Sequence, residues 1–325
     1  MRLSIVVPVL NEERNIPLLY EQVRSQLEDV ASDFELIFVD DGSTDRSAEK
    51  IAELHRADPR VKLVSFSRNF GHQIALTAGM DHSTGDAVIV MDADLQHPPA
   101  LIRTLLDRWK EGFEVVHTIR GTTADAGWLK NATGGIFYRL FRSLSGIDLP
   151  ANAADFRLLD RSVVRAFGEI RERTRFLRGL TAWTGFRSTS VPYEAPARRE
   201  GQSKFTMRRM LRLAVDGLVS FSAIPLHAAI YAGVALAALG FLYSVYALYV
   251  RFVTGTALPG WTSIIMLIAI VGGIQLMLMG VLGVYLGKIY EEVKQRPLYL
   301  VRASIGLGAS GGETERTGIG PVARG

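Results

Sequence analysis

Several chemistries are excluded by what this chain of 325 residues lacks. It has no cysteine, which excludes disulfides, thiolate zinc sites and a cysteine nucleophile. It has no GxxxxGK loop followed by Ser or Thr and no GxGxxG after the first apolar run, so no P-loop or dinucleotide fingerprint is available to hold a nucleotide. Its six histidines form no HxxxH or HExxH pair, so zinc is not indicated. Any bound metal would therefore be held by oxygen ligands.

Formal charge is missing from two long stretches near the C-terminus. Residues 225–250 and 262–287 contain no Asp, Glu, Lys or Arg, and 48% of the whole chain is hydrophobic. Each stretch exceeds the roughly 20 apolar residues that span a bilayer as a helix. A buried core helix is the alternative, but two such runs in succession favour a transmembrane hairpin. The sequence predicts this hairpin over residues 227–290.

Basic residues flank the predicted hairpin on both sides, whereas its connecting loop carries only Arg251. Residues 201–226 place basic side chains beside apolar ones, which is typical of a helix lying in the membrane interface. The positive-inside rule puts both ends of the hairpin in the cytoplasm. The apolar run at 3–8 is too short for a signal peptide, so we expect a multi-pass protein of the cytoplasmic membrane. Residues 291–325 would form a cytoplasmic tail that is disordered from Ser304 onward.

Short apolar runs alternate with helical patterns in the first part of the chain. The runs lie at residues 5–9, 34–39, 62–66, 87–91 and 113–118. Between them, apolar residues recur at helical spacing, as at Ile16, Leu19 and Val23. Strands without polar alternation, separated by helices, predict an α/β domain with a mostly parallel sheet covered on both faces. We assign this cytoplasmic catalytic domain to residues 1–200.

Polar clusters follow three of these predicted strands. Glu12 follows the first, the segment 40–45 (DDGSTD) the second, and Asp92 with Asp94 the fourth, in the stretch MDADLQHPP. Ligands bind at the carboxyl ends of strands in such sheets, although each cluster could also be only a loop or a helix N-cap. In an extended segment both carboxylates would reach one ion, with Gln96 adding a carbonyl oxygen. Such oxygen ligands suit Mg²⁺ or Mn²⁺.

Basic residues are concentrated between Arg157 and Arg212, where acidic residues are few. A block of this kind suits phosphate groups or an anionic membrane surface. Nucleic acid is the competing interpretation, but no groove-reading motif accompanies the charge. We therefore expect a lipid bilayer and phosphate-bearing ligands as partners, and no nucleic acid.

Four motifs together resemble a known family. They are Val7-Pro8-Val9-Leu10-Asn11-Glu12, Val39-Asp40-Asp41-Gly42-Ser43-Thr44-Asp45, Ser67-Arg68-Asn69-Phe70-Gly71 and Asp92-Ala93-Asp94-Leu95-Gln96. In this order and spacing the chain resembles family 2 glycosyltransferases with the GT-A fold. Among these it resembles the polyprenyl-phosphate glycosyltransferases, such as dolichol-phosphate mannose synthase and the bactoprenol glucosyltransferases. The resemblance extends over residues 3–300, with the hairpin included.

The resemblance implies a donor site for a nucleotide sugar. Its nucleotide- and sugar-binding positions correspond to Pro8, Glu12, Asp41, Asp92 and Arg120. Its metal–diphosphate motif corresponds to Asp92 and Asp94, with Gln96 as a further ligand of Mg²⁺ or Mn²⁺. Such an ion would neutralise charge on the leaving nucleoside diphosphate. Asp41 can accept a hydrogen bond from the base or ribose, whereas bracing of the turn is the role we expect for Asp40.

The resemblance also implies a site for an acceptor phosphate. Residues 198–204 fit the pattern R-x-x-G-x-S-K. Arg198 and Lys204 from this segment, with Arg175 and Arg178, are candidates, because Arg holds phosphate bidentately and Lys as a point charge. Contact with lipid headgroups or solvent is the alternative for Arg175 and Arg178.

Asp155 matches a position often proposed as a catalytic base in the family. A lipid monophosphate has a second pKa of about 6, so at neutral pH it is already largely a dianion and needs little proton removal. We therefore predict that Asp155 orients the acceptor or a basic partner, with the role of base as the alternative. The residues assigned to catalysis are Asp155, Asp94, Arg178 and Lys204.

The activity implied is inverting transfer of one sugar from a UDP-glucose-like or GDP-mannose-like donor to undecaprenyl phosphate at the cytoplasmic membrane face. The product would serve cell-envelope glycan or lipid modification. Relatives with two spans imply a homotetramer. Departures from the family leave the sugar open: Leu10 stands where tyrosine is common, His72 where lysine is often found, and residues 120–127 replace a more charged segment.

Two other functions are alternatives for this sequence. A processive polysaccharide synthase would carry a Q-x-x-R-W motif, which is missing here. A non-catalytic membrane scaffold would not need its polar candidate residues intact, and these are Asp41, Asp92, Asp94 and Lys204. Transfer of a single sugar to a lipid phosphate is therefore the favoured hypothesis.

Overall fold

The chain folds into two units in the computed structural model. The structure describes residues 1–28, 30, 33–121, 153–173, 175–194, 224–254 and 260–307. One unit consists of Met1–Thr206 together with Arg296–Gly325, and the other of Met207–Gln295. The first unit contains a sheet with its helices, and the second contains two long helices.

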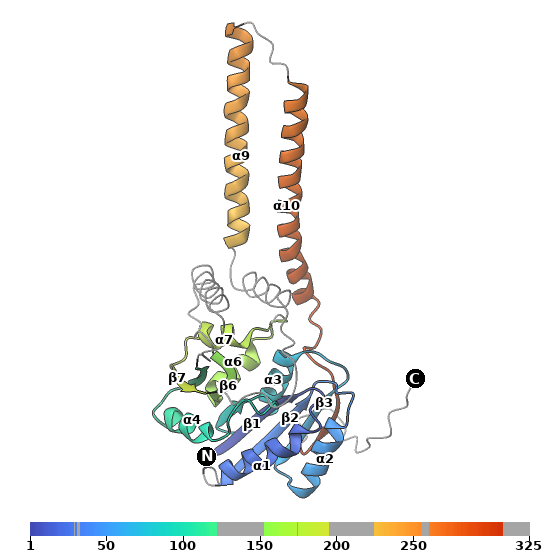
Figure 1. Cartoon of the computed structure of the whole chain (residues 1–325), viewed down its shortest axis with the longest axis vertical. Coiled ribbons are helices and arrows are strands. Elements are labelled where there is room, and N and C mark those ends of the chain that lie inside the picture. The colour runs from blue at the N-terminus through green and yellow to red at the C-terminus, as the bar shows by residue number, and fades with distance from the viewer. Residues whose placement is uncertain are drawn as a thin grey trace, which may run out of the picture. The chain divides into compact units, whose positions relative to one another are not determined.

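Across the described residues, the first unit is built on one eight-stranded sheet in the order β7-β5-β6-β4-β1-β2-β3-β8 (Figure 1). The bounds are β1 Arg2–Val9, β2 Asp33–Asp40, β3 Val61–Phe66, β4 Ala87–Val90, β5 Val115–Arg120, β6 Ala153–Asp160, β7 Ser188–Tyr193 and β8 Val301–Ile305. Strands β1 to β4 run parallel to one another, and β5 pairs in parallel with β7. Strands β6 and β8 run antiparallel to their neighbours. The predicted α/β fold with a mostly parallel sheet is confirmed.

Helices cover both faces of this sheet. The bounds are α1 Asn15–Glu28, α2 Ser47–Ala57, α3 His72–Asp81, α4 Leu101–Lys110, α6 Arg161–Glu169 and α7 Leu177–Trp183. Side chains from α1, α2 and α4 share one core cluster with β1 and β2, whereas α3 packs against a second cluster that includes Ile37 and Val39. Because both faces are covered, β1 and β2 bury nearly every side chain, which explains their unbroken apolar runs.

Strand β8 corrects the prediction for the C-terminal tail. The residues from Ser304 onward were expected to be disordered, but Ser304 pairs with Val64 in the antiparallel ladder of β8 with β3. Tyr299, just before β8, stacks on Phe66 with ring centroids 5.1 Å apart. The strand alternates partly buried Val301 with exposed polar residues, a pattern of five residues that is too short to stand out in the sequence.

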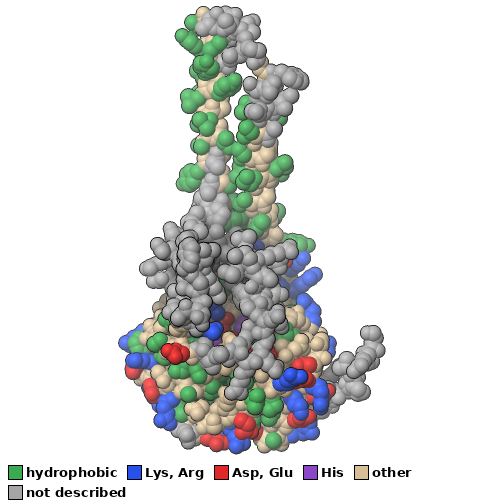
Figure 2. All heavy atoms as spheres, viewed as in Figure 1, with side chains coloured by type: hydrophobic (Ala, Val, Ile, Leu, Met, Phe, Trp, Pro, Cys, Tyr) green, Lys and Arg blue, Asp and Glu red, His purple; other side chains and the backbone are tan. Residues whose placement is uncertain are grey.

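The second unit contains two long apolar helices. They are α9 Ile224–Tyr249, which continues into the π-helical segment η1 Val250–Thr254, and α10 Trp261–Val293. The two helices run side by side, and their exposed side chains are largely hydrophobic (Figures 1 and 2). Among the residues described, one segment, Ile270–Val293, is long and apolar enough to cross a membrane, while Ala229–Tyr243 is a shorter apolar segment. The structure thus gives one candidate span where the sequence predicts two.

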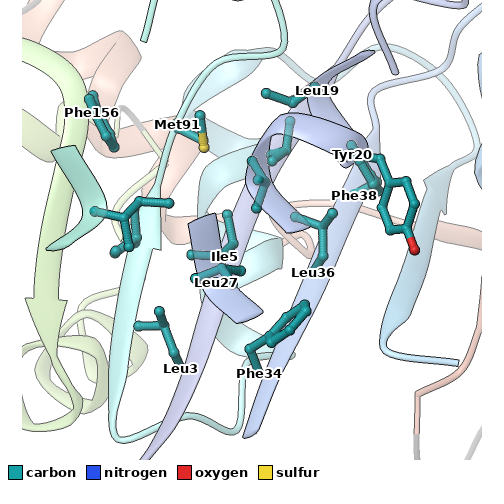
Figure 3. Close-up of a cluster of buried hydrophobic side chains, with 14 of the residues drawn as sticks. Leu3, Ile5, Leu19, Tyr20, Leu27, Phe34, Leu36, Phe38, Met91 and Phe156 are labelled. Atoms are coloured by element: carbon teal, nitrogen blue, oxygen red, sulfur yellow. The ribbon is translucent and has the colours of Figure 1, made fainter. Parts of the chain in front are cut away.

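The larger core cluster lies between the sheet and α1 (Figure 3). It includes Leu3, Ile5, Leu36 and Phe38 from the strands and Leu19, Tyr20 and Leu27 from α1. Met91 and Phe156 belong to the same cluster. Because successive side chains of a strand alternate between its faces, burial of Phe156 here turns Asp155 and Arg157 to the opposite face. The core therefore positions the charged residues of the candidate site.

Gly79 of α3 lies where the helix approaches the sheet most closely. A Cβ at this position would be 2.1 Å from Val6 Cγ1 and 3.2 Å from Val39 Cγ2. Alanine favours a helix over glycine by about 1 kcal/mol, but overpacking a rigid core costs about 1–3 kcal/mol. We expect Gly79→Ala to lower the apparent Tm of the full-length protein in detergent, measured by scanning fluorimetry.

Gly168→Ala is the matched control, because Gly168 is also helical and a Cβ there would meet no atom within 4 Å. Its Tm should stay level or rise slightly. Equal Tm values for the two variants would contradict the close approach of α3 to β1.

Candidate functional site

The loops after β1 and β2 are tied together at the carboxyl ends of the strands. Asn11, whose φ is 57°, accepts a hydrogen bond from Thr44 N at 2.8 Å and donates its own N–H to Ser43 Oγ at 3.0 Å. Glu12 donates its backbone N–H to Ser47 Oγ at 2.9 Å. These contacts bring Glu12 and the DDGSTD segment to the same rim of the sheet.

Asp40 and Asp41 are both buried and accept hydrogen bonds that stabilise this edge of the sheet. Asp40 accepts a hydrogen bond from Ser65 Oγ at 2.7 Å. Asp41 is 3% exposed and accepts from the backbone N–H groups of Phe70 at 2.7 Å and Gly71 at 3.0 Å. Burial raises the pKa of Asp41, although these N–H groups act in the opposite direction. The carboxylate of Asp41 thus holds the loop that leads into α3, and its contact with a nucleotide stays a prediction.

The stretch MDADLQHPP is not extended throughout, because Ala93 and Asp94 lie in a turn. Leu95 follows with a positive φ of 61°. Gln96 donates its backbone N–H to Asp94 Oδ1 at 3.1 Å. His97 Nδ1 accepts from Asp92 N at 2.9 Å, and its ring is 5% exposed. The turn is therefore stabilised by its own polar groups and by a buried imidazole.

One carboxylate oxygen of Asp92 is buried and makes no hydrogen bond. Its Oδ1 has no hydrogen-bond partner within the part of the chain that the structure describes, although His72 Nε2 lies 3.4 Å away. A buried oxygen that makes no hydrogen bond is suited to a further partner, such as an ion or a water. Mg²⁺ and Mn²⁺ sites commonly use one or two carboxylates and complete the shell with water and substrate phosphate. Asp92 and Asp94 fit this donor set, although the described residues include no cluster of three or more His, Asp or Glu side chains able to hold an ion unaided.

Asp155, near the start of β6, is bound by two guanidinium groups. Its Oδ1 accepts from Arg178 Nε at 3.0 Å and from Arg157 Nη2, and its Oδ2 accepts from Arg178 Nη2 at 3.0 Å. Burial disfavours the charged form, but Arg178, His72 and Arg157 outweigh it and hold the pKa of Asp155 well below its usual range. A carboxylate of such low pKa is a poor general base at neutral pH, so the geometry favours a positioning role.

His72, the first residue of α3, lies between Asp155 and the turn that carries Asp92. Its Nε2 lies 3.4 Å from Asp92 Oδ1 and 3.7 Å from Asp155 Oδ2. Burial lowers the pKa of His72, but the two carboxylates outweigh that effect and raise it. The carboxylate suited to a cation and the carboxylate bound by arginines therefore lie on either side of one imidazole.

Arg175 occupies a structural position. It is 7% exposed, and its guanidinium donates to the backbone oxygens of Ile170 and, at 3.2 Å, Phe167. These carbonyls lie at the C-terminal end of α6, where backbone oxygens lack helical partners. The structure thus favours stabilisation of α6 over the predicted contact with the acceptor phosphate.

The other predicted residues lie at or beyond the rim. Pro8 is buried in β1 opposite Val39 of β2, and Arg120 is exposed at the end of β5 opposite Tyr193 of β7. Arg198 and Lys204 lie outside the described residues.

Four residues at the site received no role from the sequence. They are His97, His117, Arg157 and Tyr193. His117 lies opposite Arg157 in the β5–β6 ladder; burial, and then Arg157 and Arg178, lower its pKa to about 3. Tyr193 packs edge-on to Phe156 and His97, with ring centroids 6.4 and 6.3 Å apart. His97 could have been found from its place in the polar stretch MDADLQHPP. The other three lie within strands, where the sequence does not show that a polar residue has a functional partner.

The N-terminal half of the chain matches a known protein family. The family model described as Glycosyl transferase family 2 covers residues 4–168. The chain belongs to this glycosyl transferase family. The match includes Asp92, Asp94 and Asp155 but ends within α6, before Arg178 of α7. This family 2 glycosyltransferase is therefore an enzyme of sugar transfer.

Its relatives resemble it over nearly the whole chain. The family 2 glycosyltransferase is 45% identical over 304 residues to the uncharacterized glycosyltransferase YkcC of Bacillus subtilis (strain 168), covering 94% of each chain. It is 40% identical over 303 residues to a bactoprenol glucosyl transferase of Shigella phage SfX, covering 93% of this chain and 99% of that one. Among solved structures, glucosyl-3-phosphoglycerate synthase from Mycobacterium tuberculosis matches with a TM-score of 0.47 and 22% identity, over 68% of this chain and 80% of that one.

Proposed function

We propose that this family 2 glycosyltransferase transfers one sugar from a nucleotide sugar to the phosphate of a polyprenyl phosphate. One observation carries the proposal: His72 Nε2 lies 3.4 Å from Asp92 Oδ1 and 3.7 Å from Asp155 Oδ2. Asp92, which is suited to a metal-bound diphosphate, and Arg178, which is suited to a second anion, thus lie at the same edge of the sheet. A donor diphosphate and an anionic acceptor would meet there.

On the donor side, Asp92 and Asp94 would hold Mg²⁺ or Mn²⁺, with Gln96 as a further ligand. When bound, such an ion neutralises charge on the leaving nucleoside diphosphate. Pro8, Glu12 and Arg120 are the proposed nucleotide and sugar contacts. Asp41 would act through the Phe70–Gly71 loop, which its carboxylate holds.

On the acceptor side, Arg178 binds the phosphate, with Arg198 and Lys204 as further candidates. A phosphate oxygen of the acceptor forms a bond to the anomeric carbon as the bond from that carbon to the diphosphate oxygen breaks. The second pKa of a monophosphate is about 6, so the attacking oxygen is already largely deprotonated at neutral pH. Asp155 then has the task of orienting Arg178, and attack opposite the leaving group inverts the anomeric centre.

The lipid nature of the acceptor rests on two further observations. Relatives covering nearly the whole chain are named bactoprenol glucosyl transferases. Helices α9 and α10 expose large hydrophobic side chains along their length, as lipid-facing helices do (Figure 2). We propose that both helices cross the membrane and that the basic residues Lys288, Lys294 and Arg296 lie on the cytoplasmic side, with the catalytic unit.

The proposal predicts a single lipid-linked sugar as product. Full-length protein in detergent, incubated with undecaprenyl phosphate, Mn²⁺ and labelled UDP-glucose or GDP-mannose, should yield one labelled lipid with one sugar per phosphate, as measured by chromatography and mass spectrometry. EDTA should abolish the product, and added Mn²⁺ or Mg²⁺ should restore it. A product carrying many sugars would indicate a processive synthase, and no product from any common donor would exclude the proposal.

A matched pair of variants locates the metal. Asp92→Asn and Asp86→Asn change carboxylates at opposite ends of β4; the Asp86 side chain is 62% exposed and accepts from Arg2 N. We expect Asp92→Asn to lose binding of Mn²⁺ with UDP in calorimetry, whereas Asp86→Asn should bind as the wild type does. Equal binding by both variants would remove Asp92 from the metal site.

A further inference from the structure

A second arginine lies behind Asp155, and the stability of the fold does not explain it. Arg157 of β6 is 2% exposed and is among the largest fully buried side chains. Its Nη2 donates to Asp155 Oδ1, whereas its Nε and Nη1 have no partner among the described residues. Burying a guanidinium costs several kcal/mol, and incomplete pairing does not offset that cost. An apolar side chain would stabilise the fold better, so the contribution of Arg157 lies at the site.

Arg157 fixes how the carboxylate of Asp155 is turned. The two residues are two positions apart on one strand and project from the same face of the sheet. Asp155 Oδ1 accepts from Arg157 as well as from Arg178 Nε, and Oδ2 accepts from Arg178 Nη2 at 3.0 Å. A hydrogen bond from the buried side therefore holds the carboxylate with both oxygens toward the fork of Arg178.

Arg157 also changes the net charge of this group. A pair of one arginine and one aspartate is neutral, whereas here two guanidiniums share the carboxylate of Asp155. An anion would meet Arg178 and not Arg157, because the side chain of Arg178 is 35% exposed and that of Arg157 is 2% exposed. In surroundings of low dielectric, the second cation strengthens the attraction for that anion.

Among the described residues, further titratable side chains adjoin this group. His117, opposite Arg157 in the ladder, is held neutral by burial and by the two arginines. Asp92 lies beside His72 and His97 and, in the proposed function, holds the metal ion. The positive charge beside Asp155 therefore comes from Arg157 and Arg178 together.

We propose that Arg157 is a positioning residue for the anionic acceptor: it turns Asp155 toward Arg178 and adds its positive charge to that of Arg178, which binds the phosphate. The inference rests on the proposed function, in which Arg178 holds the acceptor phosphate. Arg157 itself, being buried, touches neither substrate.

Arg157→Met in the full-length protein tests this role, because methionine keeps an unbranched apolar stem in the same space. We expect the KM for undecaprenyl phosphate to rise at least about tenfold, and the KM for the nucleotide sugar to stay within about twofold. Inorganic phosphate, used as a competitor of the acceptor, should inhibit the variant at least about tenfold more weakly. Arg157→Lys keeps the charge and should raise the acceptor KM less than methionine does.

Arg161→Met is the matched control, since the partners of Arg161 among the described residues are Ser83 and the backbone oxygen of Gly85, away from Asp155. Its acceptor KM should not change.

Arg178→Met distinguishes the proposed function from the role of Arg157. No change in the acceptor KM of Arg178→Met would overturn the acceptor side of the proposed function. A rise in Arg178→Met without a rise in Arg157→Met would overturn only the role of Arg157, as would an equal loss of donor and acceptor affinity. If Arg157→Met does not fold, an acceptor KM in Arg157→Lys as high as that in Arg178→Met would overturn the charge role.

Discussion

Replacing Asp155 with asparagine should lower kcat/KM for the acceptor by at least about 100-fold, equivalent to about 2.7 kcal/mol. Asparagine lacks the negative charge that pairs with both Arg157 and Arg178. Its amide N–H groups would also face the guanidinium N–H groups, which need a hydrogen-bond acceptor. Arg178 would then lose the partner that fixes its orientation. Steady-state kinetics at varied acceptor concentration measure this loss.

The pH dependence of Asp155→Asn distinguishes positioning from proton removal. The acceptor phosphate is a dianion well above pH 6, so a missing base would matter less at about pH 9 than at about pH 6. We expect no recovery at high pH, because an arginine that is wrongly aimed stays so. Recovery to near wild-type rates would instead assign Asp155 as the base.

Asp160→Asn serves as the control for this substitution, because Asp160 lies at the other end of β6. It caps α6 by accepting from Ser162 N at 2.8 Å, and asparagine is an equally good N-cap. The transfer rate should therefore stay near that of the wild type.

Replacing Glu35 with glutamine should destabilise the catalytic unit by about 3–5 kcal/mol, which corresponds to a fall in apparent Tm of roughly 10 °C. Glu35 of β2 is 0% exposed and accepts from Ser4 Oγ, from Thr84 N and Oγ1, and from Lys62 Nζ at 2.5 Å. An amide would place N–H donors against these donors and would leave Lys62, which is 12% exposed, without a counter-charge. Scanning fluorimetry of the full-length protein measures the change.

The loss should depend on pH in a defined direction. Burial raises the pKa of Glu35, but hydrogen bonds from Lys62, Ser4 and Thr84 outweigh it, so the pKa is lowered from its ordinary value of 4.5. A depressed carboxyl pKa stabilises the fold fully above the unfolded value and loses that effect as pH falls through the folded value. The Tm difference between wild type and Glu35→Gln should therefore be largest above about pH 4.5 and should shrink below it.

Glu53→Gln is the matched control, because Lys50 Nζ donates to Glu53 Oε2 at 2.7 Å but the Glu53 side chain is 44% exposed. Exposed ion pairs contribute little, so its Tm should scarcely change. Similar Tm losses in both variants would show that burial of Glu35 is not what makes its contacts strong.

The strands that the sequence predicted are those whose two faces are both buried. β1, β2, β3 and β4 read as apolar runs because helices cover each side of them. β6 escaped notice because Asp155 and Arg157 interrupt its apolar residues on the face turned toward the site. The charged residues of the candidate site thus interrupt the apolar run from which a strand would be predicted.

The candidate site was predicted in part. The residue types in MDADLQHPP indicated the chemistry, but the turn depends on a left-handed Leu95, a conformation that no leucine signals. Arg175 and Arg178 looked equivalent in the segment RTRFLRG, yet one binds the end of α6 and the other binds Asp155. Contacts between residues far apart in the chain decide such cases, and spacing along the sequence does not contain them.

Strand β8 has a consequence for the order in which the chain is made. β3 is complete after residue 66, but its edge pairs with residues 301–305, which follow the whole of Met207–Gln295. An unpaired strand edge is a template for association with other chains. The sheet therefore carries an open edge while both apolar helices are being synthesised, and the last strand closes it. Biogenesis of this enzyme thus includes an interval in which a hydrophobic hairpin and an exposed β edge must be protected together.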